Sequence, residues 1–459
     1  MRIRIFIGSA VWAAALLSLL LHPADAHAAA DGGAVEVDRD LLAAFERPAA
    51  VPFPADNPYT PEKAALGERL FHDPRLSGAD DRSCASCHIP ERGFEDGLPT
   101  GAAIDGTPLG RRVPTILNAA WGALFFWDGR ADGLEDQALG PVQNPREMNQ
   151  TLPELVGELK ADPDLVAAFA TAFPDRPEIT ADTIAAALAT FERTVVSGIA
   201  PFDRWVAGDD GAVSAAAKRG FALFTGEAGC VSCHSGWAFT DNAFHDIGLP
   251  DPDVGRGEIL GMAELNHAFK TPTLRDLGAR GPYMHNGMLT TLEQVVGHYA
   301  HVRDMTHAMD ASHAMHHGKA HPETVTRASL SPDLPKVDLS AQDQADLVAF
   351  LMSLDADAAP PPFRAETIGL PATTVTTTEI SQKDKQFQPG AITVKVGATV
   401  HVLNDDTRSH NVRVDDPKLT LNSGYQDPGQ SVELSFPEAG TYHVFCGIHP
   451  KMELVVTAE

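Results

Sequence analysis

Two hydrophobic periodicities divide the sequence into a helical region and a strand-rich region. Between Pro58 and about Asp357, apolar residues recur at i, i+3 and i+4, as amphipathic helices require, over 152–169, 181–197, 212–224, 292–300 and 341–354. Further on, the period changes to two, as half-buried strands require, over 373–380, 392–396, 399–403, 432–436 and 441–446. The pattern therefore predicts a mainly α region followed by an all-β domain.

Irregular segments are expected on both sides of the helical region. Residues 27–57, rich in Ala, Asp and Pro, are typical of a poorly ordered lead-in, and the Pro-rich residues 358–372 of a stiff linker. Between these segments we expect two lobes, at 58–208 and 209–357, and after the linker a β domain at 373–459.

The N-terminus has the pattern of an export signal. Two arginines precede an apolar run at 5–21, and Ala24-Asp25-Ala26 supplies the small residues of a cleavage site. We expect a signal peptide over 1–26, cleaved near Ala26–Ala28, and a periplasmic mature protein. An uncleaved anchor is the alternative; no other apolar run approaches the roughly 20 residues of a membrane helix, so we expect no further membrane insertion.

Composition and charge narrow the class of protein. The 459 residues are 44% hydrophobic and 21% charged, which is ordinary for a globular chain with a sizeable core. The formal net charge of −27 argues against a nucleic-acid partner, because phosphates would repel it. The five cysteines fall into three short motifs.

The helical region contains an internal repeat. Gly67-x-x-Leu70-Phe71 leads to Cys84-Ala85-Ser86-Cys87-His88, and Gly220-x-x-Leu223-Phe224 leads to Cys230-Val231-Ser232-Cys233-His234. C-x-x-C-H is typical of c-type haem attachment, in which both cysteines bind the porphyrin covalently and the histidine ligates the iron. We predict two related lobes with one haem c each. A zinc site built from both cysteine pairs is the alternative, against which their wide separation and the histidines argue.

In these motifs the chain, over roughly residues 58–357, resembles the bacterial di-haem cytochrome c peroxidases, and more closely their MauG-type branch. Further motifs carry the resemblance: Leu66-Gly67-x-x-Leu70-Phe71-x-Asp73-x-Arg75-Leu76-Ser77, Phe126-Trp127-Asp128-Gly129-Arg130, Asn144-Pro145-x-Glu147-Met148, Thr271-Pro272-Thr273-Leu274-Arg275 and Pro282-Tyr283-Met284-His285-Asn286-Gly287. The resemblance implies two cytochrome c-like lobes, with peroxide reacting at the first haem and electrons passing through the second.

The resemblance also assigns residues around the haems. It implies that Glu147 is the distal acid–base group, with Gln137 and Pro141 in the same pocket. Cleavage of the O–O bond needs a proton moved between the two peroxide oxygens, and a carboxylate above an open iron can move it. A salt-bridged surface role is the alternative for Glu147. Trp127 resembles the family's inter-haem electron relay; core packing is its alternative.

Two departures from the peroxidase pattern favour the MauG-type branch. Several peroxidases block the first haem with a distal histidine, but the matching position here is Ile104, so we expect an open, five-coordinate first haem. The peroxidases ligate the second haem with methionine, whereas the matching position here is Tyr299, as in MauG-type enzymes. A phenolate ligand lowers the reduction potential of a haem iron, whereas methionine raises it. His298, His301 and Met305 are rival ligands, and a core role is the alternative for Tyr299.

Family members also hold a calcium ion between the lobes, through an asparagine side chain and backbone carbonyls. Arg112 stands at the asparagine position here. The resemblance therefore leaves undecided whether the protein binds a calcium ion.

The strand-rich domain carries one cysteine, in the loop Cys446-x-x-His449-x-x-Met452, with His410 further upstream. Two imidazoles, one thiolate and a weak thioether are the ligands of type 1 (blue) copper. Over residues 373–459 the domain resembles small cupredoxins such as plastocyanin, amicyanin and pseudoazurin, which implies a Greek-key β-sandwich with one copper ion. A copper-free sandwich with a buried cysteine is the alternative.

A His- and Met-rich segment at 301–321 precedes this domain. Imidazole and thioether ligands suit copper, so the segment either captures copper for the domain or forms a mobile loop.

These motifs together indicate a di-haem cytochrome c peroxidase-like oxidoreductase. Hydrogen peroxide would be reduced at the first haem, with electrons relayed through the second haem and the fused cupredoxin, which an external cytochrome c or cupredoxin would re-reduce. Fusion raises the effective concentration of the donor to about millimolar. The alternatives are a MauG-type oxidase that modifies a partner protein and a non-catalytic electron carrier.

Overall fold

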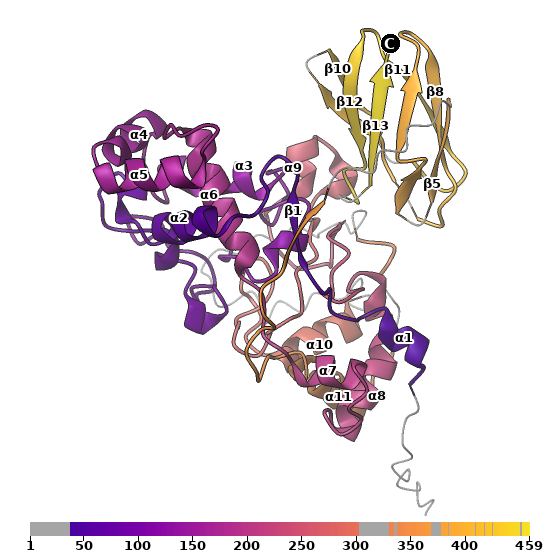
Figure 1. Cartoon of the computed structure of the whole chain (residues 1–459). Helices are drawn as coiled ribbons and strands as arrows, with labels where there is room; N and C mark the ends of the chain where they lie inside the picture. The colour runs from indigo at the N-terminus through magenta and orange to yellow at the C-terminus, as the bar shows by residue number, and fades with distance from the viewer. Residues whose placement is uncertain are drawn as a thin grey trace, which may run out of the picture. The chain divides into compact units, whose positions relative to one another are not determined.

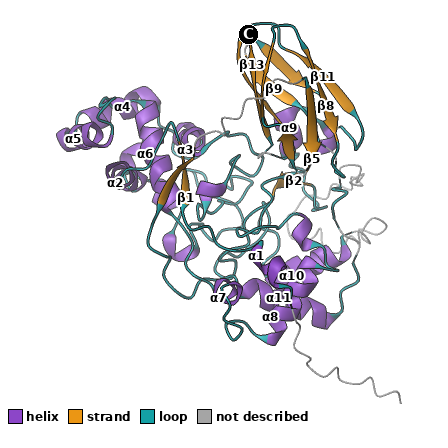
Figure 2. Cartoon of the chain, turned by 45° about the vertical axis from the view of Figure 1, so that its right-hand side comes forward, coloured by secondary structure: helices purple, strands orange, loops and turns teal. Residues whose placement is uncertain are grey.

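A computed structural model describes residues 37–302, 330–334, 337–368, 378–383, 385–408, 410–416, 418–424, 426–449 and 452–459 (Figure 1). Val35–Glu459 form one compact unit. The described residues fold into helices followed by a β-sandwich (Figure 2), which confirms the predicted fold class. The expected signal peptide, and the His/Met-rich segment beyond Val302, lie outside the described residues. None of the described helices is long and apolar enough to cross a membrane.

The first lobe is built from α2 (Pro61–Phe71), α3 (Leu134–Gln143), α4 (Leu152–Lys160), α5 (Pro163–Ala172) and α6 (Ala181–Thr194). Leu70, Leu155 and Leu188 are fully buried in its core. Helices α2 and α6 cross closely at Gly67, where a Cβ atom would lie 2.0 Å from the Ala187 carbonyl oxygen. Only glycine allows this approach.

The prediction of one helix over 152–169 is wrong. Helix α4 ends at Lys160 and α5 begins at Pro163. Proline has no N–H to continue the first helix but suits the first position of a new one. The Asp162 side chain caps this new helix by accepting hydrogen bonds from the N–H groups of Asp164 and Leu165.

The second lobe is built from α7 (Pro201–Val206), α8 (Ala215–Thr225), α10 (Leu292–His301) and α11 (Ala341–Met352). Its core contains a cluster of buried aromatic rings, among them Phe221 and Phe350, whose centroids lie 5.4 Å apart. Helices α8 and α11 cross at Gly220, where a Cβ atom would lie 2.0 Å from the Asp346 carbonyl oxygen. The sequence repeat therefore corresponds to a repeated helix crossing.

The predicted segment boundaries need correction. Residues 37–57 are not a poorly ordered lead-in, because α1 (Arg39–Ala43) and Phe45 pack into the core of the second lobe. Helix α7 packs into the same core, so the second lobe begins before residue 209. Strands β1 (Val51–Pro54) and β4 (Ala365–Ile368) pair in parallel, so residues 365–368 of the predicted linker form a strand.

The C-terminal domain is a sandwich of two sheets (Figure 1). One sheet has the order β10 (Leu419–Asn422), β9 (Arg413–Asp416), β12 (Gly440–Phe445), β13 (Glu453–Ala458), β7 (Ala391–Val394). The other has the order β11 (Ser431–Ser435), β8 (Thr399–Asn404), β5 (Glu379–Lys383), β6 (Gln386–Gln388). Alternate residues of β8 are buried, as the period of two predicts. The expected strand at 373–380 is described only from Glu379 onward.

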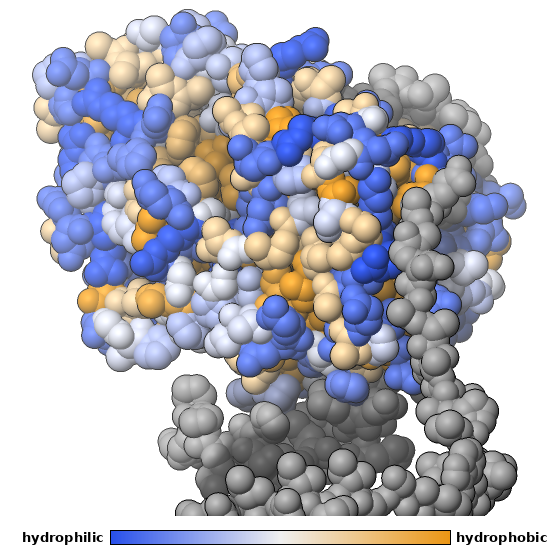
Figure 3. All heavy atoms as spheres, turned by 90° about the horizontal axis from the view of Figure 1, so that it is seen from below, coloured by the Kyte–Doolittle hydropathy of each residue, from blue (hydrophilic) through white to orange (hydrophobic). Residues whose placement is uncertain are grey.

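The segment between the second haem motif and α10 packs against the sandwich. It contains β2 (Phe244–His245), α9 (Arg256–Leu260) and β3 (Phe269–Lys270). The hydrophobic core of the sandwich continues into this segment through Leu260 and Met262. Elsewhere hydrophilic side chains cover much of the surface, with apolar ones in smaller groups, on the face that Figure 3 shows.

Candidate functional site

One cavity of about 430 Å³ is lined by both lobes. Its walls include His88, Trp127 and Gln137 from the first lobe and His234 and Tyr299 from the second. Cys230 and Cys233 line it as well, so seven of the predicted site residues meet at one cavity. Most of its other wall residues are apolar, which suits a flat hydrophobic cofactor.

The first C-x-x-C-H motif forms a tight turn. The 3₁₀ turn Cys84–Ser86 brings the His88 N–H to 3.0 Å from the Cys84 carbonyl oxygen. His88 Nδ1 lies 3.0 Å from the Phe94 carbonyl oxygen; because a carbonyl only accepts, Nδ1 is the donor and Nε2 is left for a metal. Burial lowers the pKa of His88, which keeps the imidazole neutral, as an iron ligand must be.

The second motif repeats this geometry. The His234 N–H donates to the Cys230 carbonyl oxygen at 2.9 Å, and His234 Nδ1 donates to the Phe239 carbonyl oxygen at 2.9 Å. Phe94 and Phe239 both have a left-handed backbone, with φ of 59° and 52°. Each lobe therefore presents a histidine Nε2 beside a cysteine pair, and the residues fit two haems c.

The zinc alternative finds no support in the geometry. Among the described residues, two groups of His, Cys, Asp or Glu side chains lie close enough together to hold a metal ion. Neither group contains more than one of the four motif cysteines. Burial also raises the pKa of Cys84 to about 12.

The residues proposed for the distal side of the first haem are only partly brought together. Gln137, on α3, lines the cavity, whereas Pro141 and Glu147 are not among the residues that line it. The Pro141 carbonyl accepts a hydrogen bond from the Met148 N–H, which closes the turn that carries Glu147. Burial raises the pKa of Glu147, against the opposing charge of Arg130.

Glu147 nevertheless lies near the first haem motif. Burial, followed by the carboxylate of Asp96, raises the pKa of the Cys87 thiol, and Glu147 adds to this shift. The side chain is half-buried, with Asn144 as a hydrogen-bond partner.

Trp127 connects the two lobes. Its indole Nε1–H donates to the Arg112 carbonyl oxygen at 3.0 Å. Its own carbonyl oxygen accepts from the Lys270 N–H of β3 at 2.8 Å. The ring therefore has a fixed position in the cavity wall.

Tyr299 is the one described rival for the second haem ligand that lines the cavity. His298 is directed elsewhere, with Nε2 donating to the Ile247 carbonyl oxygen at 2.8 Å. His301 is exposed at the end of α10, and Met305 lies outside the described residues. Burial, then the nearby cysteines of the second motif, raises the pKa of Tyr299, so the phenol loses its proton only when a cation such as ferric iron binds it.

The residues around Arg112 do not fit a calcium ion. The Arg112 side chain is 6% exposed, pairs with Glu95 and donates to the Arg280 carbonyl oxygen at 2.8 Å. A guanidinium has no lone pair to offer a cation and repels one by its charge. An internal ion pair therefore takes the position of the expected calcium-binding asparagine.

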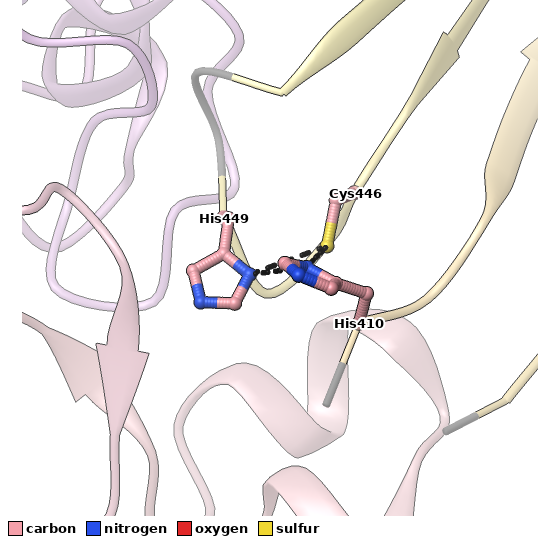
Figure 4. Close-up of side chains that lie close together, drawn as sticks. All are labelled: His410, Cys446 and His449. Atoms are coloured by element: carbon pink, nitrogen blue, oxygen red, sulfur yellow. Dashed lines mark hydrogen bonds between the residues drawn. The ribbon is translucent and has the colours of Figure 1, made fainter. Parts of the chain in front are cut away.

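Three of the predicted copper ligands converge at one end of the sandwich (Figure 4). Cys446 Sγ lies 3.8 Å from His410 Nδ1 and 3.7 Å from His449 Nδ1, and the two nitrogens are 2.9 Å apart. Cys446 and His449 follow β12, whereas His410 precedes β9. Burial lowers the pKa of both histidines, so their imidazoles are neutral.

The surroundings of this triangle fit type 1 copper. Met452 is fully buried, and its N–H donates to the His449 carbonyl oxygen at 2.9 Å. The Asn411 N–H donates to Cys446 Sγ at 3.4 Å. His410 Nε2 donates to the Asp406 carboxylate at 3.1 Å, which turns Nδ1 toward the triangle.

A charged cluster that sequence analysis missed lies beside the second haem motif. Asp241 Oδ2 accepts from His245 Nε2 at 3.0 Å and from Lys385 Nζ, in the β domain, at 3.2 Å. Burial alone would raise the pKa of Asp241, but the His245 hydrogen bond and the Lys385 charge hold it far below its usual value. The Asp241 N–H donates to the Cys233 carbonyl oxygen at 2.8 Å. No local pattern marks these residues, because Lys385 is 144 positions from Asp241.

Glu192, on α6, was also missed. It lines the cavity, is 5% exposed, and its Oε2 has no hydrogen-bond partner. Burial raises its pKa to about 8. Glu192 stands on the same helix face as the buried Ile184 and Leu188, and an acid at the helical period of an apolar face was the available signal.

Comparisons with known proteins agree with this geometry. Residues 61–211 match the family "Di-haem cytochrome c peroxidase", and residues 347–458 match "Cupredoxin-like domain". The methylamine utilization protein MauG of Methylorubrum extorquens is 48% identical over 322 residues, which cover 70% of this chain and 85% of the relative. The cytochrome-c peroxidase IdrP1 of Denitromonas iodatirespirans is 37% identical over 339 residues, which cover 66% of this chain and 84% of the relative.

A solved structure supports the same class. The crystal structure of a MauG-like protein associated with microbial copper homeostasis is 32% identical, with a TM-score of 0.60, and the match covers 68% of this chain and 95% of that one. The fold and site are those of a di-haem oxidoreductase. The chain belongs to the di-haem cytochrome c peroxidase/MauG family and carries a C-terminal cupredoxin-like domain.

Proposed function

We propose that the chain reduces hydrogen peroxide at its first haem with electrons that reach the haem cavity from its own cupredoxin domain. One observation carries this proposal: Lys385 of the cupredoxin domain is ion-paired with Asp241, whose N–H binds the Cys233 carbonyl of the second haem motif. The copper ligands and the haem motif are thus joined inside one compact unit.

The cofactors would be held by residues with suitable chemistry. Cys84 and Cys87 would attach the first haem, and Cys230 and Cys233 the second, with His88 and His234 as proximal ligands and Tyr299 as the second ligand of the second haem. His410, Cys446, His449 and Met452 would hold copper. When bound, the haems supply the peroxide site and electron storage, and copper supplies a one-electron centre.

Glu147 would handle the proton. Reduction of H₂O₂ to two molecules of water consumes two electrons and two protons. The Glu147 carboxylate takes a proton from one peroxide oxygen and returns it to the other, and its raised pKa makes it a better base for the first of these steps. The Gln137 amide, in the cavity wall, donates a hydrogen bond to peroxide.

A chain of contacts supports electron entry at the second haem. The Asp406 carboxylate accepts from His410 Nε2 at 3.1 Å and from the Lys385 N–H at 3.0 Å. The Lys385 side chain then reaches Asp241. Trp127, in the cavity wall that both lobes share, would then carry electrons from the second haem to the first.

Removal of the copper site tests the proposal. We expect Cys446→Ser and His449→Gln to slow peroxide consumption with an external one-electron donor. His443→Gln is the matched control, because His443 stands on β12 with its side chain 56% exposed. Unchanged consumption in both ligand variants would remove the cupredoxin domain from the pathway.

A separate observation favours a second function, the oxidation of a partner protein. Tyr299 lines the cavity, and the chain is 48% identical to a methylamine utilization protein MauG, so we also propose oxidation of a partner protein as the alternative activity. A mass change in a co-expressed secreted protein, lost with Tyr299→Phe, would support it. A non-catalytic carrier predicts six-coordinate ferric haems, so a high-spin electron paramagnetic resonance signal would exclude that reading.

We further propose that the protein acts in the periplasm. The basic and apolar pattern of residues 1–26 supports export, and export would bring the protein to a periplasmic electron donor. Sequencing of the mature N-terminus should find cleavage near Ala26–Ala28; an intact Met1 would contradict it.

A further inference from the structure

Arg256 is a buried cation at the contact between the cupredoxin domain and the rest of the chain. Its side chain is 2% exposed and lies over the Phe244 ring at 4.5 Å. Nη1 donates to the carbonyl oxygens of Asp128, at 3.0 Å, and Gly129, at 2.7 Å. Nε donates to the Gly447 carbonyl oxygen at 3.3 Å.

No ion pair between this guanidinium and a carboxylate is found among the described residues, although the charges of Asp128 and Asp132 favour its protonated form. Among the described residues, its hydrogen-bond partners are all carbonyl oxygens, and the Asp128 carboxylate is paired with Arg111 and Arg130. Burial lowers the pKa of Arg256 to about 10, and the nearby Arg413 charge adds to the shift. A buried cation without an acid partner is costly, and the hydrogen bonds to both segments offset that cost.

The two segments that Arg256 joins are the ones that matter for electron transfer. Gly447 directly follows Cys446, the predicted thiolate ligand of copper. Asp128 and Gly129 directly follow Trp127, the predicted inter-haem relay. One side chain therefore connects the copper-ligand loop to the cavity wall.

Neighbouring contacts hold the loop in the same place. A Cβ atom on Gly447 would lie 3.0 Å from Leu260 Cδ1 of α9. Asn411, which follows the ligand His410, accepts from the Gly447 N–H at 2.6 Å and donates to Met262 Sδ at 3.7 Å. Both ligand-bearing segments are thus packed against α9 and the residues after it.

We propose that Arg256 is the positioning residue that fixes the copper-ligand loop against the Trp127 segment and so sets the rate of electron transfer from the cupredoxin domain to the haem cavity. The proposal rests on the proposed peroxidase function. Each peroxide takes two electrons, delivered singly as reduced copper is oxidised, and an external one-electron donor re-reduces the copper.

The size of the effect follows from the hydrogen bonds. Loss of the bonds to a charged donor weakens the contact of the two segments by about 10- to 100-fold. Arg256→Gln should therefore slow transfer by about that factor. Arg256→Lys keeps the charge but cannot reach three carbonyls at once, so it should give an intermediate rate.

The experiment uses the full-length protein with both haems and copper. The protein is reduced with ascorbate, mixed rapidly with one equivalent of H₂O₂, and copper re-oxidation is followed by the blue absorption band. A rate independent of protein concentration identifies the internal step. Arg413→Gln is the control, because it removes a nearby positive charge that stacks on Phe445 within the cupredoxin domain.

We expect slow re-oxidation in Arg256→Gln, an intermediate rate in Arg256→Lys and the wild-type rate in Arg413→Gln, with unchanged copper spectra and midpoint potentials. A wild-type rate in both Arg256 variants, or a loss of rate explained by a shifted copper potential, overturns the inference. Should the glutamine variant not fold, the lysine variant decides alone. If the wild-type protein shows no concentration-independent step, the proposed function fails instead.

Discussion

Burial shifts the pKa of groups that line the cavity and of Glu147, which does not line it. It raises the pKa of Glu147 and of Glu192 and lowers the pKa of His88 and of His234, because a site removed from water disfavours every charged form. The two histidines are therefore neutral, and Glu192, with a pKa of about 8, keeps its proton at neutral pH.

Glu147→Gln should lower the rate of peroxide reduction by about 10²- to 10⁴-fold, the contribution of a positioned acid–base group. Glutamine has nearly the same shape but cannot accept and return a proton. Stopped-flow measurement of the reaction with H₂O₂ checks this, with Glu178→Gln, an exposed glutamate of the same lobe, as the control. Equal rates in the two variants would assign Glu147 to the alternative, a structural surface role.

The pH dependence of kcat/KM for peroxide should reflect the raised pKa of the Glu147 carboxyl group. Glu147 must be ionised to take the first proton, so kcat/KM for peroxide should fall as the pH falls through its pKa. Because burial raises that pKa, the fall should occur above the pH range of an ordinary glutamate. The profile of Glu147→Gln should lack this step; a variant that keeps it would show that another group titrates.

At the scale of elements, the two lobes share one feature, a close helix crossing at a glycine. Gly67 of α2 and Gly220 of α8 each begin a G-x-x-L-F sequence upstream of a haem motif, and each lets its helix touch the backbone of a partner, α6 or α11. The repeated G-x-x-L-F therefore has a packing reason in both lobes.

Gly67→Ala and Gly220→Ala should each destabilise the protein by about 1–3 kcal/mol or more, since a methyl group would meet a backbone carbonyl that cannot move aside. This clash outweighs alanine's helix preference of about 1 kcal/mol. Gly157→Ala on α4, where no atom lies within 4 Å, should instead be neutral or stabilising. Thermal unfolding of the three variants measures the difference, and equal melting temperatures would contradict the packing argument.

Local sequence patterns predicted where helices and strands form better than they predicted which elements pair with one another. The helical period located α6, α10 and α11, and the C-x-x-C-H motifs located His88 and His234, two of the four histidines that line the cavity. The period failed at Pro163, where covalent geometry outweighs hydrophobic spacing. It also gave no sign that β4 pairs with β1, because such pairing depends on residues more than 300 positions apart.

At the scale of the molecule, the contacts that join segments distant in sequence were not predictable from one sequence. Arg256 with Gly447, Lys385 with Asp241 and Arg112 with Glu95 each connect residues that no motif relates. Each of these contacts involves a charged side chain that is buried or half-buried. Such groups are costly unless their partners are in place, so they specify how the described parts of the chain meet.

Arg112 gives the last prediction, which concerns how the lobes are held together. Since an internal guanidinium stands at the position of the expected calcium-binding asparagine, prolonged treatment with EGTA should leave the stability and peroxide rate unchanged. Arg112→Gln should lower the free energy of unfolding, by less than the about 3–5 kcal/mol of a fully broken buried ion pair, because Glu95 keeps Arg280 as its second partner at 3.5 Å. Arg176→Gln, at an exposed site, should cost little. If EGTA instead removes a bound calcium ion and destabilises the wild-type protein, then the ion pair does not replace the cation, and some other group of oxygen ligands must hold it.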